Sequence, residues 1–249
     1  MKVFLIYGKL VSEGDGAFMK IMSFNTQHCN NYLEQKIDYQ IMANAINEVG
    51  ADIVGLNEMF DQGSEFGKQT EKLAELTGLK YHYFAKACQI GNEGEYGNGF
   101  LSRYKIVRAE TIPIPDPNPR KYSGYYETRC VLKALLENGV TVLVCHFGLN
   151  PDEQENAVKT IIGNLENEKC VLMGDFNIEP DNQLLKPIFE KMVDTSTYFK
   201  KKKTSFPSDK PEIKIDYIFV SHDIGVLSAD IPEIIASDHR PHIAEVLVR

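Results

Sequence analysis

The sequence predicts a layered α/β sandwich in which hairpins and helical crossovers both connect the strands. Short apolar runs of strand length alternate with stretches whose apolar residues recur at helical spacing, as is typical of a layered α/β domain. Asn138-Gly139 separates two apolar runs, and this dipeptide is a strong signal for a tight hairpin. Because hairpins join antiparallel strands and helices join parallel ones, mixed sheets are expected rather than one purely parallel sheet.

The first half of the chain contains the clearest helical pattern. Apolar residues recur at helical spacing over residues 37–49, and Gly50 follows where a left-handed C-cap is expected. Buried strands are expected on both sides, at residues 21–24 and 53–56. A second helix is expected at residues 70–76, with strands at residues 81–85 and 99–102.

The second half begins with the two strands of the hairpin, expected at residues 129–136 and 140–146. Asn150-Pro151-Asp152-Glu153 then supplies an N-cap, a first-turn proline and two first-turn acids, which predict a helix that runs to about residue 165. The remaining elements are a strand at residues 171–173, a helix at 183–192, and strands at 217–220 and 243–248.

The domain boundary lies near the N-terminus. At 249 residues the chain is near the upper size limit for one compact domain, and we expect residues 20–249 to form it. Residues 1–19 are then an N-terminal extension, because the Gly-rich stretch at 13–16 separates them from the first expected strand. The alternative, which stays open, is that residues 3–7 add an edge strand.

Charge and cysteine content restrict partners and location. The formal net charge is −8, whereas a protein that grips many backbone phosphates of a nucleic acid needs a cationic surface. The five cysteines are scattered and odd in number, which indicates reduced thiols and a cytoplasmic location. No apolar run approaches the roughly 20 residues that span a bilayer, so no membrane association is expected.

Polar residues collect where apolar strands end, which is where α/β folds commonly build ligand sites. A single Asn or Asp there is usually a turn residue, and a single His is more often a hydrogen-bonded core residue than a catalyst. The ordered set of acidic, amide and histidine residues favours a catalytic site. Its motifs are SFNTQH with Asn25, LNE with Glu58, YGNGFLSR with Asn98, CHFGL with His146, GDFN with Asp175 and Asn177, IDYIFVS with Asp216, and SDHRP with Asp238 and His239.

In these motifs and their order, the chain from Lys20 onward resembles the endonuclease/exonuclease/phosphatase superfamily. The resemblance implies a four-layer α/β sandwich, with two mixed β-sheets packed face to face and helices on the outside. It also implies a hydrolase of phosphate esters that depends on Mg²⁺ or Mn²⁺. Both ions prefer oxygen ligands, which suits the carboxylates and amides of the motifs.

The resemblance also implies a role for each residue. Glu58 is expected as the principal metal ligand, with Asn25 and Asp238 beside it. His239 is expected as the general base, or as a donor to the phosphate, with Asp216 orienting its ring. Asp175 and Asn177 would hold the attacking water and a phosphate oxygen. His146 would donate to a phosphoryl oxygen or protonate the leaving group, with Asn98 orienting it at the substrate.

The substrate stays open between several classes. The first expectation is a small or exposed phosphate ester, the alternative is DNA or RNA cleaved by a nuclease of the same superfamily, and the last is a binding module without turnover. Arg129 either binds a phosphate or forms an ion pair with Glu127. The lysine run at residues 200–203 either borders the substrate cleft or is a solvated loop; it consists of Lys200, Lys201, Lys202 and Lys203.

Overall fold

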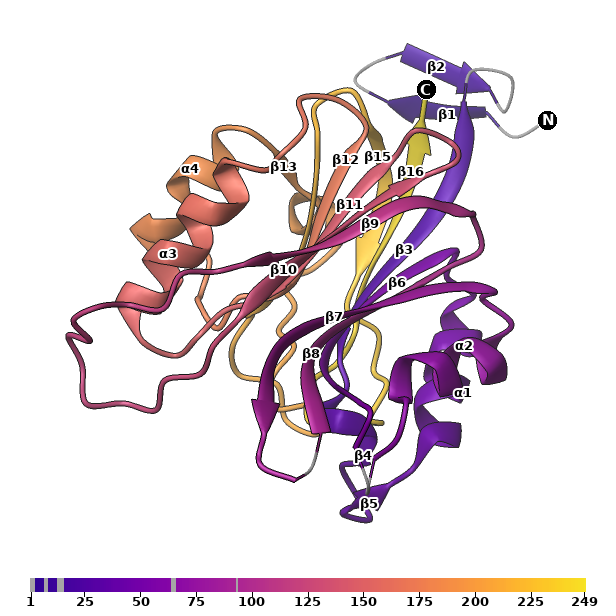
Figure 1. Ribbon diagram of the computed structural model, residues 1–249. Coiled ribbons are helices and arrows are strands. Elements are labelled where there is room, and N and C mark those ends of the chain that lie inside the picture. The colour runs from indigo at the N-terminus through magenta and orange to yellow at the C-terminus, as the bar shows by residue number, and fades with distance from the viewer. Residues whose placement is uncertain (1–2, 7–8, 13–15, 64–65, 93) are drawn as a thin grey trace.

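Two six-stranded sheets pack face to face, with helices on their outer faces (Figure 1). The computed structural model describes residues 3–6, 9–12, 16–63, 66–92 and 94–249. Helices α1 (Tyr39–Val49) and α2 (Gln69–Thr77) lie on one side of the molecule, and α3 (Pro151–Ile162) and α4 (Lys186–Phe189) on the other. The predicted four-layer α/β sandwich is confirmed.

The two sheets share one pattern of strand directions. Each contains a single parallel pair, and antiparallel strands flank that pair on both sides. The first sheet has the order β15 (Gly225–Asp230), β16 (His242–Val248), β3 (Ala17–Asn25), β6 (Ile53–Asp61), β8 (Gly94–Ser102), β7 (Tyr81–Ile90). The second has the order β13 (Val193–Asp194), β14 (Asp216–Val220), β12 (Cys170–Asp175), β11 (Thr141–His146), β10 (Cys130–Leu136), β9 (Ile106–Pro113).

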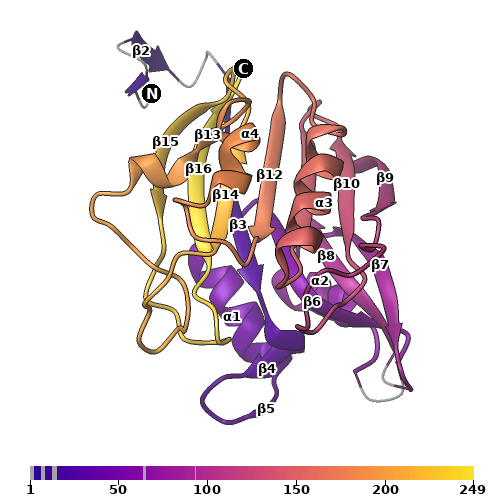
Figure 2. The ribbon, with the colours of Figure 1, turned by 90° about the vertical axis from the view of Figure 1, so that its left-hand side faces the viewer.

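A helix connects the two strands of each parallel pair. Helix α1 joins β3 to β6, and its ends match the sequence signals, since Asp38 caps its first turn and Gly50 closes it at φ 66°. Helix α3 joins β11 to β12, and Asn150 with Glu153 forms its capping box. Both crossovers therefore bring the carboxyl ends of two parallel strands to one edge of a sheet. In Figure 2, β3 and β12 both run towards the edge that carries the small hairpin of β4 (Asn30–Asn31) and β5 (Lys36–Ile37).

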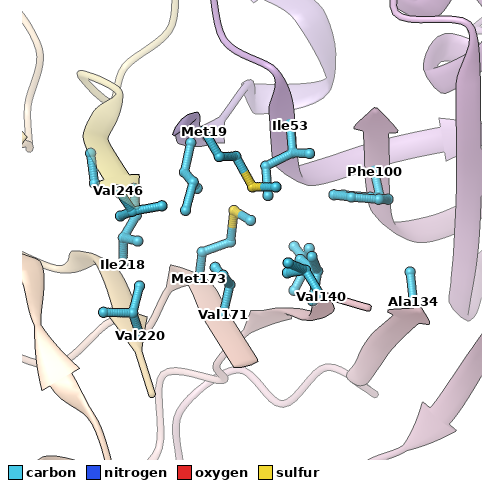
Figure 3. Close-up of a cluster of buried hydrophobic side chains, with 14 of the residues drawn as sticks. Met19, Ile53, Phe100, Ala134, Val140, Val171, Met173, Ile218, Val220 and Val246 are labelled. Atoms are coloured by element: carbon cyan, nitrogen blue, oxygen red, sulfur yellow. The ribbon is translucent and has the colours of Figure 1, made fainter. Parts of the chain in front are cut away.

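The main hydrophobic core lies between the sheets (Figure 3). Met19 and Ile53 from the first sheet face Val171, Met173 and Ile218 from the second, and all five are at most 1% exposed. Two further apolar clusters fill the outer layers, one under α1 and α2 and one under α3 and α4. This burial on both faces explains why the central strands read as continuous apolar runs.

Several element boundaries differ from the prediction. The helix expected at residues 183–192 is a short 3-10 helix, η3 (Gln183–Leu185), followed by the single turn α4. Strands β6, β7 and β8 are longer than expected, because their polar ends continue the pairing beyond the apolar runs. Strands β9 and β15 were missed, since exposed polar residues interrupt their apolar pattern.

The two described strands before residue 13 pair with each other and not with the large sheets. Strands β1 (Val3–Ile6) and β2 (Lys9–Ser12) form a separate two-stranded sheet, so β1 does not extend either large sheet. Tyr7, in the alternative edge strand, and residues 13–15 of the Gly-rich stretch lie outside the described residues. The first domain strand, β3, begins at Ala17 rather than Ile21. The division of the chain at residues 19 and 20 stays a prediction.

Two further expectations concern the cysteine thiols and membrane-spanning helices. All five cysteine side chains are free thiols. Within the described ranges, no helix combines the length and the apolar character needed to cross a bilayer.

Candidate active site

The carboxyl ends of the two parallel pairs supply the centre of the candidate site. Asn25 ends β3 beside Asn57 of β6, and His146 ends β11 beside Asp175 of β12. Across the two sheets, Asn25 Nδ2 donates to Asp175 Oδ2 at 3.0 Å, although 150 positions separate the two residues in the sequence. The fold therefore brings strand ends from both sheets into direct contact.

A local distortion of β6 turns Glu58 towards this centre. The pairing of β6 with β8 shifts register between Leu56 and Met59, and Glu58 has φ 60°. A bulge with a left-handed residue re-aims a side chain at the cost of backbone strain, which is common at functional sites. Asn25 Nδ2 donates to Glu58 Oε1 at 3.0 Å, so one amide group bridges Glu58 and Asp175.

The carboxylate of Glu58 lies close enough to Asp238 to affect its pKa. Burial raises the pKa of Asp238; the charge of His239 lowers it in part, and the Glu58 carboxylate raises it further. The two neighbouring carboxylates supply oxygen donors, which a divalent hard cation would stabilise. Asn25 turns its Nδ2 atom towards Glu58, and its Oδ1 atom accepts from the Gln27 backbone N–H at 3.1 Å. The carboxylates of Glu58 and Asp238 therefore fit such an ion, and ligation by Asn25 would require its amide group to turn.

Asp216 and His239 form the most tightly defined pair in the site. His239 Nδ1 lies 2.9 Å from Asp216 Oδ2, and His239 Nε2 lies 3.6 Å from Asp175 Oδ2. Burial alone would lower the pKa of His239, but the carboxylates of Asp216 and Asp175 outweigh it and raise the pKa to about 10. Burial raises the pKa of Asp175, against the opposing charge of His239. The phenyl ring of Phe206 lies against the imidazole, with the ring centres 4.8 Å apart.

Asp175, Asp216 and His239 also bring potential metal-ligand atoms within 4.8 Å of one another. In this group the His239 Nδ1 atom and the Asp216 Oδ2 atom are already joined by a hydrogen bond. A nitrogen engaged in this way suits the control of a proton better than the binding of an ion. The expected metal position at Asn25, Glu58 and Asp238 stays a prediction.

His146 is buried beside Asp175 and approaches the same carboxylate oxygen as His239. Its Nε2 atom lies 3.5 Å from Asp175 Oδ2 and 3.2 Å from Asn177 Nδ2. Burial, the charge of Arg129 and the charge of His239 all lower the pKa of His146 well below its usual range. The surroundings of His146 therefore favour a neutral imidazole, whereas those of His239 favour the charged form.

Asn177 completes the arrangement through an unusual backbone conformation. Its φ is 50°, its backbone N–H donates to Asp175 Oδ1 at 2.9 Å, and its Nδ2 donates to the Phe147 carbonyl at 3.1 Å. These bonds hold the Asn177 amide group beside both His146 and Asp175. A group that is held in this way can bind an oxygen atom without reorganisation.

Asn98 is buried beside Asn57, between the two sheets. Its Oδ1 accepts from Asn57 Nδ2 at 2.8 Å, and its Nδ2 donates to the Cys130 carbonyl at 3.0 Å. Asn57 in turn donates to the Cys145 carbonyl and accepts from the Asp175 backbone N–H at 2.9 Å. Asn98 therefore supports the strand ends through Asn57, while the Nδ1 atom of His146 is contacted by Arg129 at 2.9 Å. Its role in substrate binding stays a prediction.

The structure shows which groups surround Arg129 and the lysine run, whose roles the sequence left open. Arg129 forms the ion pair with Glu127, at 2.7 Å, but within one segment rather than between adjacent strands. The lysine run borders a pocket of about 390 Å³ whose lining includes Phe199, Lys201, Lys202 and Lys203, together with Lys214, two residues before Asp216. Lys203 is engaged there by Asp230 at 2.6 Å. The contacts of Arg129 and Asn57 were not expected from sequence, because the LNE motif assigned a role only to Glu58, and Arg129 was left between a phosphate contact and an ion pair.

Comparisons with known proteins agree with this architecture. A sequence model of the Endonuclease/Exonuclease/phosphatase family matches residues 22–239. Among curated proteins, none matches the chain significantly.

Solved structures share the fold at low sequence identity. An endonuclease/exonuclease/phosphatase family protein from Bacteroides thetaiotaomicron has a TM-score of 0.75 at 17% identity, covering 94% of this chain and 96% of its own. The mannosyl-6-phosphatase of Bacteroides thetaiotaomicron VPI-5482 has a TM-score of 0.73 at 17% identity, with 92% and 99% covered. ANGEL2, a 2′,3′-cyclic phosphatase solved with adenosine-2′,3′-vanadate, has a TM-score of 0.71 at 15% identity, with 94% and 96% covered.

Proposed function

The chain belongs to the endonuclease/exonuclease/phosphatase family, and we propose that it is a divalent-metal-dependent hydrolase of phosphate esters. The observation that carries the proposal is the contact of strand ends from both sheets. It places the His239–Asp216 pair within 3.6 Å of Asp175, and Asn25 links Asp175 to Glu58. A proton-handling pair and an oxygen donor set therefore face the same space.

The metal position in this proposal is formed by Asn25, Glu58 and Asp238, and Mg²⁺ or Mn²⁺ suits its oxygen ligands. When bound, the ion supplies positive charge that neutralises the phosphate oxygens and lowers the pKa of the adjacent His239. Side chains of the protein transfer the proton and position the water and the phosphate.

Each residue around Asp175 has a part in hydrolysis. His239 accepts the proton of the attacking water at Nε2, while Asp216 holds the ring through Nδ1. Asp175 and Asn177 hold the water and a phosphate oxygen in position. His146, whose Nε2 atom also lies near Asp175 Oδ2, donates to a phosphoryl oxygen.

The substrate that we propose is a small or exposed phosphate ester. The net charge of −8 disfavours a long duplex, whose many backbone phosphates need cationic surface. The pocket beside the lysine run offers Phe199 and two exposed lysines, Lys201 and Lys202, to the part of the substrate beyond the phosphate. Two structural neighbours carry the names mannosyl-6-phosphatase and 2′,3′-cyclic phosphatase, which supports small esters over polymers.

A cytoplasmic location is part of the same proposal. The free thiols support it, because reduced cysteines are typical of that compartment.

The test is a panel of phosphate monoesters and diesters, including bis-p-nitrophenyl phosphate, assayed with Mg²⁺, Mn²⁺ or EDTA. We expect hydrolysis that EDTA abolishes and that Glu58→Ala and His239→Ala each remove. Asp175→Asn should lower kcat strongly while the thermal unfolding midpoint changes little. Exposed Glu168→Gln is the matched control, and its activity should equal that of the wild type.

Two other outcomes would replace the proposal. Nicking of a plasmid or cleavage of an abasic oligonucleotide, with no turnover of any small ester, would establish the nuclease alternative. No turnover of any small ester, plasmid or oligonucleotide would favour a binding module.

A further inference from the structure

Arg129 lies directly behind His146, on the side away from Asp175. Arg129 Nη1 is 2.9 Å from His146 Nδ1 and 2.7 Å from Glu127 Oε1, and the arginine side chain is only 11% exposed. Tyr96, which is also buried, contributes to the electrostatic environment of the guanidinium. The arginine is therefore enclosed, with one face against the imidazole.

The chemistry of this contact decides where the His146 proton lies. A guanidinium has N–H donors and no acceptor, so a hydrogen bond between Arg129 and His146 requires an unprotonated Nδ1. A neutral imidazole then carries its single proton on Nε2. A charged imidazolium would set an N–H group against an N–H group of a second cation at 2.9 Å. The hydrogen bond to Arg129 is thus compatible only with a neutral imidazole that carries its proton on Nε2.

The other face of the ring shows what this tautomer is suited for. The groups that face Nε2 are Asp175 Oδ2 at 3.5 Å and Asn177 Nδ2 at 3.2 Å. The Asn177 amide is oriented by its bond to the Phe147 carbonyl, so its NH₂ group points towards the imidazole. Asn177 Nδ2 is also a donor, so the two ring nitrogens face one donor each and only one of them can accept. The shorter contact, 2.9 Å from the charged Arg129, favours acceptance at Nδ1. The Nε2–H group and Asn177 Nδ2 are then two donors side by side, and a phosphoryl oxygen between them would accept from both.

We propose that Arg129 is a positioning residue that holds His146 neutral with its proton on Nε2, so that His146 donates a hydrogen bond to a phosphoryl oxygen and does not protonate the leaving group. The part of this statement that concerns the oxygen rests on the proposed function. The part that concerns the proton on His146 does not. Burial and the neighbouring cations Arg129 and His239 support the neutral form, because each lowers the pKa of His146.

The first experiment is ¹⁵N NMR of the histidine side chains, because nitrogen chemical shifts separate protonated from unprotonated imidazole nitrogens. Comparison with the spectrum of His146→Gln identifies the signals of His146 among those of the six histidines. In the wild-type protein at neutral pH we expect His146 with a proton on Nε2 alone. A proton on Nδ1, or on both nitrogens, would overturn the proposal without any arginine variant.

The second experiment compares two arginine variants. The glutamine of Arg129→Gln can accept as well as donate, so either imidazole nitrogen can carry the proton. The lysine of Arg129→Lys, like arginine, can only donate. We expect a mixed tautomer in R129Q and the wild-type tautomer in R129K. Arg108→Gln, an exposed substitution on β9, is the control and should leave the His146 spectrum unchanged.

Kinetics on the best substrate of the panel then separate positioning from binding. We expect R129Q to lower kcat by about 10²-fold, the size of effect seen when one donor to an oxyanion is lost, and R129K to regain most of that loss. A loss in R129Q that is confined to KM, with an unchanged tautomer, would overturn the proposal and assign Arg129 to direct phosphate binding. If the wild-type protein hydrolyses no ester, the proposed function fails, and the nitrogen spectra still decide the state of His146. If R129Q does not fold, the wild-type and R129K spectra decide it.

Discussion

His239 Nδ1 lies 2.9 Å from Asp216 Oδ2, although 23 residues separate them and only Asp216 belongs to a strand. Asp216 begins β14, where it pairs across the sheet with Asp175 at the end of β12. One ladder position therefore sets the spacing of the two carboxylates that face His239. The two carboxylates raise the pKa of His239 to about 10 despite its burial, so the protonation state of the site depends on them.

Asp216→Asn should lower the maximal kcat by about 10²-fold to 10⁴-fold, because an Asn amide can donate to Nδ1 and favour the tautomer that cannot accept a proton at Nε2. If His239 is the base, kcat rises with pH through its pKa in the active enzyme. Removing the Asp216 charge lowers that pKa, so the acid limb should move to lower pH. The measurement is kcat from pH 5 to pH 10 for both proteins.

Two results would contradict this prediction. A wild-type kcat that falls as pH rises through the same range would make His239 a donor rather than a base. An unchanged pH profile in Asp216→Asn would show that the carboxylate does not control the imidazole. Glu168→Gln controls for the loss of one negative charge at an exposed position.

Glu58→Gln should weaken the binding of Mg²⁺ and Mn²⁺ at least about tenfold, the scale seen when even a residue behind the metal ligands is changed. Glutamine keeps an oxygen that can accept from Asn25 Nδ2, so the fold and the Asn25 contact should survive. Isothermal titration calorimetry with each ion measures the affinity directly. Glu48→Gln, on the exposed face of α1, should bind as the wild type does, and equal affinities in Glu58→Gln would exclude Glu58 as a ligand.

The fold and the position of the site were predictable because both depend on local signals. Asn25, His146 and Asp175 each follow an apolar run, and parallel strands connected by capped helices must bring such residues to one edge. The hydrogen bonds among them were not predictable in the same way. The Arg129–His146 contact joins the start of one strand to the end of its neighbour, and only their register decides it.

Asn98 shows the limit of arguing from a motif. Its place in YGNGFLSR predicts a residue of the site, yet the direction of its side chain depends on the pleat of β8 against β6. That pleat directs the amide between the sheets, to Asn57 and the Cys130 carbonyl. Polar residues at strand interiors therefore need the register before a role can be given to them.

Gly174→Ala should destabilise the protein by about 3 kcal/mol or more, because a methyl group has no space at this position. Gly174 has φ 147°, and a Cβ atom there would overlap the Cys145 carbonyl oxygen of the neighbouring parallel strand. The first residue of the GDFN motif is thus required by close strand packing. Urea unfolding measures the change.

Gly163→Ala is the matched control for this prediction. Gly163 follows α3 with φ −72°, and the nearest atom to an added Cβ is at 3.5 Å, which is ordinary contact. Alanine there should be neutral or stabilise by up to about 1 kcal/mol. Equal effects of the two substitutions would show that the spacing of β11 and β12 can adjust.

Lys214 gives the protein a specific pH dependence of stability. The residue is 6% exposed; its Nζ lies 3.3 Å from the ring centre of Tyr217 and 3.8 Å from Asp194 Oδ2, and it has no hydrogen-bond partner among the described residues. Burial lowers its pKa from 10.5 to about 8, although Asp194 and Asp216 oppose the shift. Between these two values the unfolded chain binds more protons than the folded one. The free energy of unfolding therefore rises with pH in this window.

Lys214→Met should remove that rise. The difference in unfolding free energy between wild type and variant should change by up to about 3 kcal/mol in favour of the wild type from pH 8 to pH 10.5, since one pKa unit corresponds to about 1.4 kcal/mol. Groups that titrate equally in both proteins, His239 among them, cancel in this difference. Urea unfolding at intervals of pH measures it, and exposed Lys191→Met should give a difference that is constant with pH. A constant difference for Lys214→Met as well would mean that the buried ammonium stays charged in the folded protein throughout the window.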